Sequence, residues 1–483
     1  MRFIDRNDIE EKLSRSYPLS GRWHNGFHLE MPFGLINDPN GLAFADGGYH
    51  IFFQWNPLGC EHRNKCWAYT RTVDFVHYSR PKLSMWPADA HDKDGCYSGC
   101  GFEEDGRVRV LYTCNAKDAQ GVRTPAQRFG TLLTDGTVRK EEIAAAKEAE
   151  GYTAHFRDPY IFRQKNKHYF VLGAQNNALK GRAVIYGRRP EQAESWEFLG
   201  ELKTRYTDFG YMWECPNFLQ FAEGDVLLFC PQGLAAQELA YQNRYQCGYL
   251  AGTGDMEALS MEHGEFHELD RGFDFYAPQV MEHEGRHILL GWMGMPEEED
   301  LYPAAEEGWL YSLTVPRELQ LRDGRLYQEP VRELAELREA GSEQRIREAQ
   351  TEVYHAALPE RCEIKIEAVF GRAARVEAAL FYGTEKLCFV YDRVQQIMTV
   401  DREGMKLGGR GRRSFPLAAA DSLTLHILAD TSAVEAFFQN GAETAAAAVF
   451  PAADEAPRLA VSSDAPLEQL NGTVWGMGKY IYG

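Results

Sequence analysis

Three acidic residues stand in similar local settings although they lie far apart in the chain. Asp38 and Asp158 directly precede a proline, and Glu214 precedes one by two positions. Two carboxyl groups that flank a glycosidic bond can hydrolyse it with retention, because one attacks the anomeric carbon while the other protonates the leaving oxygen. Crowding by a third carboxylate helps the acid to hold its proton. This chemistry requires the three side chains to meet in the folded protein.

A repeat in the first two-thirds of the chain predicts that they do meet. Five similar segments each contain a leading residue pair, a proline or glycine, an apolar stretch, a polar turn and a second apolar stretch. Each segment is typical of a β-hairpin, and the spacing leaves room for two further strands. Such a period of four-stranded units predicts a five-bladed β-propeller. The proline or glycine recurs at Pro39, Gly99, Pro159, Pro216 and Pro278.

Equivalent positions in the blades of a propeller face the same part of the central axis, so the leading pairs should converge at one mouth. An isolated aspartate before proline is more often a turn residue, and residues 37–41 are expected to turn the chain into its first inner strand. The repeat position that the three carboxylates share favours catalysis. The leading pairs are Asn37-Asp38, Tyr97-Ser98, Arg157-Asp158, Glu214-Cys215 and Tyr276-Ala277.

A metal site is the competing interpretation of the carboxylates, because carboxylate clusters also hold Ca²⁺. No loop has the dense ligand spacing of a calcium site, and the histidines are scattered along the chain. We therefore expect neither a metal nor a cofactor.

The remaining sequence predicts a second all-β domain. Residues 140–151 are prone to form a helix and are expected to be an excursion between blades, and residues 331–349, rich in charge and helix formers, to link two domains. Short alternating strands then predict a β-sandwich without a concentrated polar cluster. The expected division is a propeller at 1–335, a linker at 336–349 and a β-sandwich at 350–483.

The composition limits the partners. The formal net charge of −19 argues against nucleic acid but leaves room for a small anionic ligand, which needs only a local basic cluster. No segment is apolar enough to span a membrane, and no secretory signal is visible, so we expect a cytoplasmic protein. The ten cysteines form no CxxC pair and are expected to be free thiols. The expected partner is a small sugar, and the oligomeric state stays open.

At these residues the chain resembles glycoside hydrolase family 32, the invertase and fructanase family, from about residue 20 to its end. The motifs are NDPNG at 37–41, FRDP at 156–159 and ECP at 214–216. The resemblance implies a five-bladed propeller with a β-sandwich. It also implies a retaining β-fructofuranosidase in which Asp38 is the nucleophile, Glu214 the acid/base and Asp158 a stabiliser of the transition state.

The resemblance further implies which residues bind the sugar. Arg157 would position the acid/base, and Trp67 and Trp292 would wall the pocket. The implied substrate-binding set is Asn37, Asn40, Gln54, Trp67, Tyr97, Ser98, Arg157, Cys215, Tyr276 and Trp292.

Finer features are similar to the bacterial branch of this family that acts on sucrose 6-phosphate, notably MWECP at 212–216 and GWMGMPEE at 291–298. Release of fructose from sucrose 6-phosphate or sucrose is therefore expected. The alternatives are exo-hydrolysis of, or fructosyl transfer on, fructo-oligosaccharides, and a non-catalytic sugar-binding propeller.

The chain also departs from the usual family motifs. Leu35-Ile36 replaces Trp-Met, Cys100 replaces the final serine of an aromatic-Ser-Gly-Ser motif, and residues 67–69 read Trp-Ala-Tyr instead of Trp-Gly-His. An unusual preference for the leaving group is the expected consequence. Arg63 and Lys65 could meet a phosphate, although a solvated charged loop is the stronger expectation.

Overall fold

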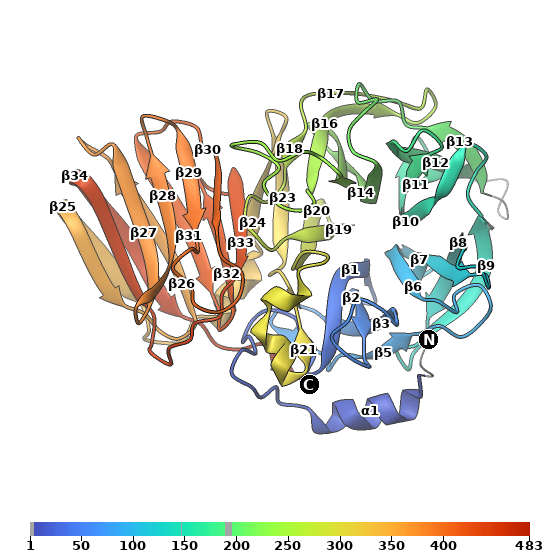
Figure 1. Cartoon of the computed structure of the whole chain (residues 1–483), viewed down its shortest axis with the longest axis horizontal. Coiled ribbons are helices and arrows are strands. Elements are labelled where there is room, and N and C mark those ends of the chain that lie inside the picture. Colours follow the sequence, from blue (N-terminus) through green and yellow to red (C-terminus); the bar gives the residue numbers. More distant parts are fainter. Residues whose placement is uncertain (1–3, 146, 189–195) are drawn as a thin grey trace.

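The computed structural model describes residues 4–145, 147–188 and 196–483 (Figure 1). Almost all of its regular structure is β-strand, which confirms the expected all-β class. The one α-helix among the described residues, α1 (Arg6–Arg15), lies against the strand β5 (Lys82–Met85) at the bottom of Figure 1. The described residues also form three short 3₁₀ helices, η1 (Glu299–Leu301), η2 (Pro303–Glu307) and η3 (Arg332–Leu337).

The first 330 residues contribute to sheets that follow one another along the chain. The first sheet contains β1 (Gly34–Ala45), β2 (Gly48–Asn56), β3 (Cys66–Thr72), β4 (His77–Tyr78), β5, β21 (Trp309–Leu310) and β35 (Ile481–Tyr482). The second contains β6 (Cys96–Glu104), β7 (Arg107–Lys117), β8 (Arg123–Leu132) and β9 (Val138–Ala145). The third contains β10 (Tyr152–Gln164), β11 (Lys167–Asn176), β12 (Gly181–Arg188) and β13 (Glu197–Glu201).

Two further sheets complete this half of the molecule. One contains β14 (Met212–Phe221), β15 (Gly224–Gln232), β16 (Gly248–Asp255), β17 (Ser260–His263) and β18 (His267–Glu268). The other contains β19 (Tyr276–His283), β20 (Arg286–Met293), β22 (Ser312–Leu313), β23 (Arg317–Arg322) and β24 (Arg325–Pro330). The leading strands β1, β6, β10, β14 and β19 contact one another in a closed circle, so the sheets have a propeller-like arrangement.

The leading residue pairs lie inside these leading strands, next to a shift in the pairing register. In β1 the register shifts between Ile36 and Pro39, and comparable shifts follow Cys96, Arg157, Glu214 and Tyr276. A β-bulge redirects side chains and tolerates a proline, which cannot donate to the ladder. The expected turn at 37–41 is therefore wrong, because this segment is a bulged part of β1.

The helix-prone segment at 140–151 differs from the structure. Residues 140–145 form part of β9, where Arg128 of β8 pairs with Ile143. Residues 331–349, which are also rich in helix formers, contain η3 and the start of β25 (Gln344–Ala357). Lysine, glutamate and alanine have high helix propensity, but pairing with a neighbouring strand overrides that weak preference. Residue 146 lies outside the described residues.

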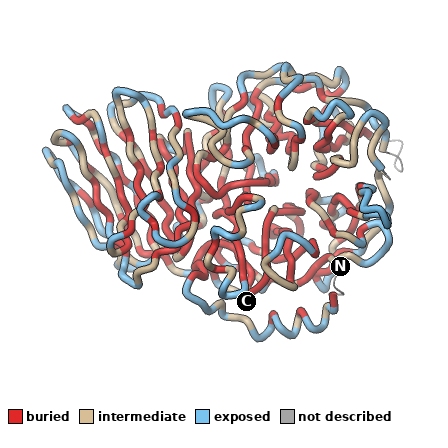
Figure 2. The backbone as a smooth tube through the Cα atoms, viewed as in Figure 1, coloured by how far each residue is buried: buried red, intermediate tan, exposed pale blue. Residues whose placement is uncertain are grey.

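The C-terminal part forms one ten-stranded sheet with the β-sandwich-like character that was expected. The sheet has an apolar core of its own, while Leu428, Phe437 and Ala446 pack into a core of the first half. Buried residues run through the strands of both halves (Figure 2). Besides β25 its strands are β26 (Cys362–Val369), β27 (Arg375–Tyr382), β28 (Glu385–Asp392), β29 (Ile397–Asp401), β30 (Arg412–Pro416), β31 (Ser422–Ala429), β32 (Ala433–Phe438), β33 (Glu443–Ala448) and β34 (Arg458–Gly476).

A buried ionic cluster joins the two halves. Arg317 donates from Nε to Glu435 Oε2 at 2.8 Å and from Nη1 to Asp270 Oδ2 at 3.0 Å, while His28 bonds to Asp430 and Glu435. Burial opposes the charged imidazole, but these two carboxylates outweigh it and raise the pKa of His28 to about 9. This contribution to stability is complete below pH 6.5 and is lost as the pH rises through 9.

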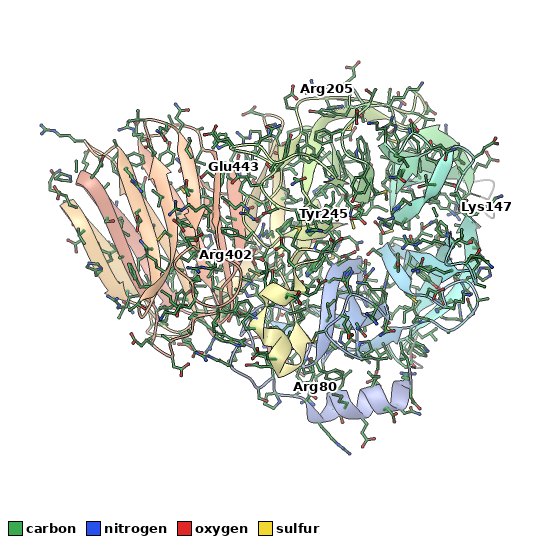
Figure 3. All side chains as sticks on the ribbon, viewed as in Figure 1. Arg80, Lys147, Arg205, Tyr245, Arg402 and Glu443 are labelled. Carbon is green, nitrogen blue, oxygen red and sulfur yellow. The ribbon has the colours of Figure 1, made fainter. Side chains whose placement is uncertain are left out.

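Further contacts extend the junction to residues labelled in Figure 3. Glu443 of β33 forms ion pairs with Arg271 and Arg325, and Arg402 pairs with Asp274. The C-terminal sheet is therefore held to the first half by charged groups as well as by packing.

Replacement of Arg317 by methionine is expected to lower the free energy of unfolding by about 3–5 kcal/mol, because Glu435 and Asp270 stay buried with fewer partners. Urea denaturation followed by tryptophan fluorescence measures the loss. The matched control is Arg325→Met, since Arg325 is 40% exposed beside Glu443 and its ion pair contributes about 1 kcal/mol or less. Equal losses in the two variants would contradict a special role for the buried cluster.

Candidate active site

A cavity of about 870 Å³ opens where the leading strands converge. Each of these five strands contributes at least one side chain to its lining, as the repeat predicts. The contributing pairs are Asn37 and Asp38 of β1, Tyr97 and Ser98 of β6, Arg157 and Asp158 of β10, and Glu214 and Cys215 of β14, together with Tyr276 of β19. Tyr245, labelled in Figure 3, lines the same cavity.

Asp38 is held by a polar network. Its Oδ1 accepts a hydrogen bond from Asn37 Nδ2 at 2.9 Å, and its Oδ2 accepts one from Ser98. Gln54 ties these two donors together, because it accepts from Asn37 at 2.8 Å and donates to Ser98 at 2.7 Å. The carboxylate is thereby fixed in one orientation.

Lys65 also belongs to this network. Its Nζ donates to Asn37 Oδ1 at 2.6 Å, and its side chain is buried. Burial lowers the pKa of Lys65 to about 7 even though the nearby Asp38 favours the charged amine. Burial likewise raises the pKa of Asp38, and the positive charge of Lys65 is the largest effect that opposes it. The expected solvated loop is therefore wrong for Lys65, whereas Arg63 is exposed at the cavity rim.

Asp158 lies close to Asp38 across the thiol of Cys215. The sulfur is 3.9 Å from Asp38 Oδ2 and 3.8 Å from Asp158 Oδ2, and the Cys215 N–H donates to Asp158 Oδ2 at 3.1 Å. Burial raises the pKa of Asp158, Arg157 opposes the rise, and the charges of Glu214 and Asp38 add to it. The described residues contain no group of three or more side chains arranged to hold a metal ion.

Glu214 is oriented through both of its carboxylate oxygens. Arg157 donates to Oε1 from Nη2 at 2.6 Å and from Nε at 3.1 Å. Gln232 and Tyr276 each donate to Oε2 at 2.7 Å. Asp158 follows Arg157 directly in β10, so this arginine links the positions of two carboxylates.

Two residues of the expected substrate-binding set do not line the cavity. Trp67 is fully buried with its indole N–H on the carbonyl of Tyr97, because an inward-facing position of β3 points into the core between two sheets. Asn40 lies deeper along the axis and accepts from the Gly99 N–H at 3.1 Å. The other members line the cavity, and they are Asn37, Gln54, Tyr97, Ser98, Arg157, Cys215, Tyr276 and Trp292.

Several cavity residues were not found from the sequence. His155 bonds to Arg157 Nη1 at 3.0 Å, and Gln232 bonds to Glu214. Gln232 ends β15 opposite Met212, so the pairing of the fourth hairpin could have placed it next to Glu214. His155 lies two residues before Arg157 and therefore on the same side of β10, a signal that strand alternation provides.

Three carboxylates that converge in a polar, sugar-sized cavity define a glycosidase site. Residues 28–330 match the "Glycosyl hydrolases family 32 N-terminal domain", and residues 333–475 match the "Glycosyl hydrolases family 32 C terminal". The chain belongs to glycosyl hydrolases family 32.

Individual relatives agree with this assignment. The chain is 37% identical to the sucrose-6-phosphate hydrolase of Bacillus subtilis (strain 168), over 92% of this chain and 93% of that protein. The structure of the sucrose-6-phosphate hydrolase from Lactobacillus gasseri has a TM-score of 0.88 and 27% identity, covering 99% of this chain and 97% of its own. A mutant GH32 β-fructofuranosidase of Bombyx mori in complex with sucrose has a TM-score of 0.85 and 25% identity, covering 99% of both chains.

Proposed function

We propose that the protein is a retaining β-fructofuranosidase that releases fructose from sucrose 6-phosphate and from sucrose. The observation that carries this proposal is that Asp38, Asp158 and Glu214 line one cavity in a family 32 chain. The names of the relatives support phosphorylated sucrose as the substrate. Transfer between fructo-oligosaccharides is not favoured, and a non-catalytic binder would not need both a nucleophile and an acid.

The positions of the side chains support a role for each carboxylate. Asp38 attacks the anomeric carbon of the fructosyl group while Glu214 donates a proton to the glycosidic oxygen, and the bond to glucose breaks. Glu214 then removes a proton from water, which attacks the fructosyl–enzyme and releases Asp38. Asp158 lies close enough to Asp38 for its charge to stabilise the oxocarbenium-like transition state.

The remaining polar groups suit a fructosyl unit. Trp292 lines the cavity, and its buried indole N–H has no hydrogen-bond partner among the described residues. Gln54 and Ser98 hold Asp38 and also face the cavity. Arg157, Tyr276 and Gln232 keep Glu214 in position to reach the leaving oxygen.

We further propose three features of the whole chain. The closed circle of leading strands supports five blades, with one blade for each of the sheets that begin at β1, β6, β10, β14 and β19. The apolar core that the C-terminal sheet has of its own supports a division into a domain at 1–335 and a domain at 350–483, joined at 336–349. Ten unpaired cysteines and a phosphorylated substrate support a cytoplasmic location. No described helix is long and apolar enough to cross a membrane.

Product analysis tests the proposed reaction. Sucrose 6-phosphate should give glucose 6-phosphate and fructose, and rapid NMR should detect β-fructofuranose as the first anomer because two displacements retain configuration. Faster initial cleavage of kestose than of either sucrose substrate would overturn the substrate assignment. Calorimetric binding of these sugars without any cleavage would overturn catalysis itself.

Replacement of Lys65 by methionine is expected to move the acidic limb of the pH profile of kcat/KM upward by about one to three pH units. The positive charge of Lys65 holds down the pKa of Asp38, and Asp38 must be ionised to attack, so the variant should lose activity at a higher pH. The control Lys65→Arg keeps the charge and should keep the limb closer to its original position. An equal loss at every pH would show that Lys65 only supports packing.

A further inference from the structure

Two basic residues face each other at the turn end of the β7–β8 hairpin and line the catalytic cavity. Lys117 ends β7, Arg123 begins β8, and the two residues are direct partners in the antiparallel register. Side chains of directly opposed residues project from the same face of a sheet. In a chain with a net charge of −19, such a pair inside a cavity calls for an explanation.

Neither cation is neutralised by a described carboxylate. Arg157 is paired with Glu214, whereas Arg123 lies over the ring of Tyr97 at 5.4 Å. Asp94 is the nearby acid, but its Oδ2 accepts the backbone N–H of Lys117 at 2.6 Å. Lys117 is exposed and Arg123 is half-buried, so both can meet a ligand in the cavity.

The pair lies on the side of the cavity where the leaving group must depart. Arg123 lines the same cavity as His155, Arg157 and Glu214. Burial lowers the pKa of His155 to about 4, and the positive charges of Arg157 and Arg123 contribute to this shift. His155 in turn bonds to Arg157, and Arg157 bonds to Glu214. Because Glu214 protonates the glycosidic oxygen in the proposed reaction, the glucosyl unit must lie next to it.

We propose that Arg123 and Lys117 form a phosphate subsite that binds the 6-phosphate of the leaving glucosyl unit. This inference rests on the proposed function and adds the residues that distinguish sucrose 6-phosphate from sucrose. A phosphate monoester carries close to two negative charges at neutral pH. The fork of an arginine binds two phosphate oxygens, and a lysine adds a point charge.

The position of the pair explains why the sequence did not reveal it. The charges of the 61–65 loop are adjacent in sequence and therefore suggested a phosphate contact, but Lys65 donates its hydrogen bond to Asn37. Lys117 and Arg123 are separated by the tip of a hairpin and become neighbours only when β7 and β8 pair. Backbone hydrogen bonds from Asp94 to Asn115 and from Cys96 to Lys65 bring this hairpin end against the first sheet.

The test compares kcat/KM for sucrose 6-phosphate with kcat/KM for sucrose in the full-length protein. The ratio should fall by about 10- to 100-fold in Arg123→Gln, the range expected for loss of a charge-assisted hydrogen bond, and should fall further in the double variant with Lys117→Gln. Arg123→Lys should recover part of the ratio. The matched control is Arg205→Gln, an exposed arginine at the top edge of Figure 3, which should leave the ratio unchanged.

Inhibition by products provides a second readout. Glucose 6-phosphate should inhibit the wild-type protein more strongly than glucose, and Arg123→Gln should weaken only the former. Inorganic phosphate that competes with sucrose 6-phosphate, but much more weakly than glucose 6-phosphate, would support a subsite for the substrate and not one for free phosphate. Inorganic phosphate that inhibits as strongly as glucose 6-phosphate would overturn the assignment to the leaving group.

The outcomes separate the subsite from the proposed function. If the wild-type protein hydrolyses sucrose but the variants keep the wild-type ratio, the subsite is wrong and the β-fructofuranosidase assignment stands. A wild-type protein that shows no preference for the phosphorylated substrate overturns the subsite in the same way. Absence of fructose release from both substrates would overturn the proposed function, and the subsite with it.

Discussion

Asp38→Asn is expected to lower fructose release by about 10⁴-fold or more, because the amide is a poor nucleophile and no fructosyl–enzyme forms. The hydrogen bonds around Asp38 come from Asn37 and Ser98, and an amide of the same shape can occupy the position with the folded structure kept. The measurement is the initial rate of fructose release from sucrose 6-phosphate, together with the melting temperature.

The matched control for this change is Asp46→Asn in the same hairpin. Asp46 is exposed at the turn between β1 and β2, at a positive φ that asparagine also adopts readily. It should leave the rate unchanged. Full activity in Asp38→Asn, or a comparable loss in both variants, would contradict a nucleophilic role for Asp38.

Glu214→Gln is expected to lower kcat/KM on sucrose 6-phosphate by about 10²- to 10⁴-fold, the range of general acid–base catalysis. The reason is that glutamine can accept only some of the hydrogen bonds that Glu214 accepts, and it cannot donate a proton to the glycosidic oxygen. Fructosyl fluoride needs no such proton, so the first step on this substrate should be largely kept and should appear as a burst of fluoride in rapid-mixing experiments. Azide should then accelerate turnover, because it attacks the fructosyl–enzyme without a general base.

The variants of Glu214 and Asp38 should differ in how their activity depends on the leaving group. Asp38→Asn should show neither a fluoride burst nor rescue by azide. The control Glu223→Gln removes an exposed carboxylate from the turn of the same β14–β15 hairpin and should behave like the wild-type protein. Equal losses of Glu214→Gln on sucrose 6-phosphate and on the fluoride would argue against an acid role.

The repeat made the general position of the site predictable from sequence. Proline at the same place in four of five units placed Asp38, Asp158 and Glu214 in equivalent strands, and local alternation predicted those strands. The bulges were not predictable, because residues 37–41 have the composition of a turn and only pairing with β2 shows that they continue a strand. Helix formers in 140–145 misled for the same reason, since β9 depends on its partner β8.

Side-chain partners were harder to predict than positions. Lys65 belongs to a segment, 61–65, that has the composition of a charged loop. Nothing in the neighbouring sequence indicates that its amine is buried against Asn37. Trp67 matched a sugar-contact position, yet its direction in β3 places it in the core. Tertiary packing determines the direction and the partners of these two side chains, and neither can be predicted from the residues next to them in the sequence.

The order in which the ribosome makes the chain gives the first sheet a special status. The second, third and fourth sheets are each built from one continuous stretch of chain, so each can form as it emerges. The first sheet, which carries Asp38, pairs β1 with β21 and β4 with β35 and therefore spans residues 34 to 482. Unlike those three sheets, the sheet that carries Asp38 therefore cannot be completed until residues near position 482 have been made.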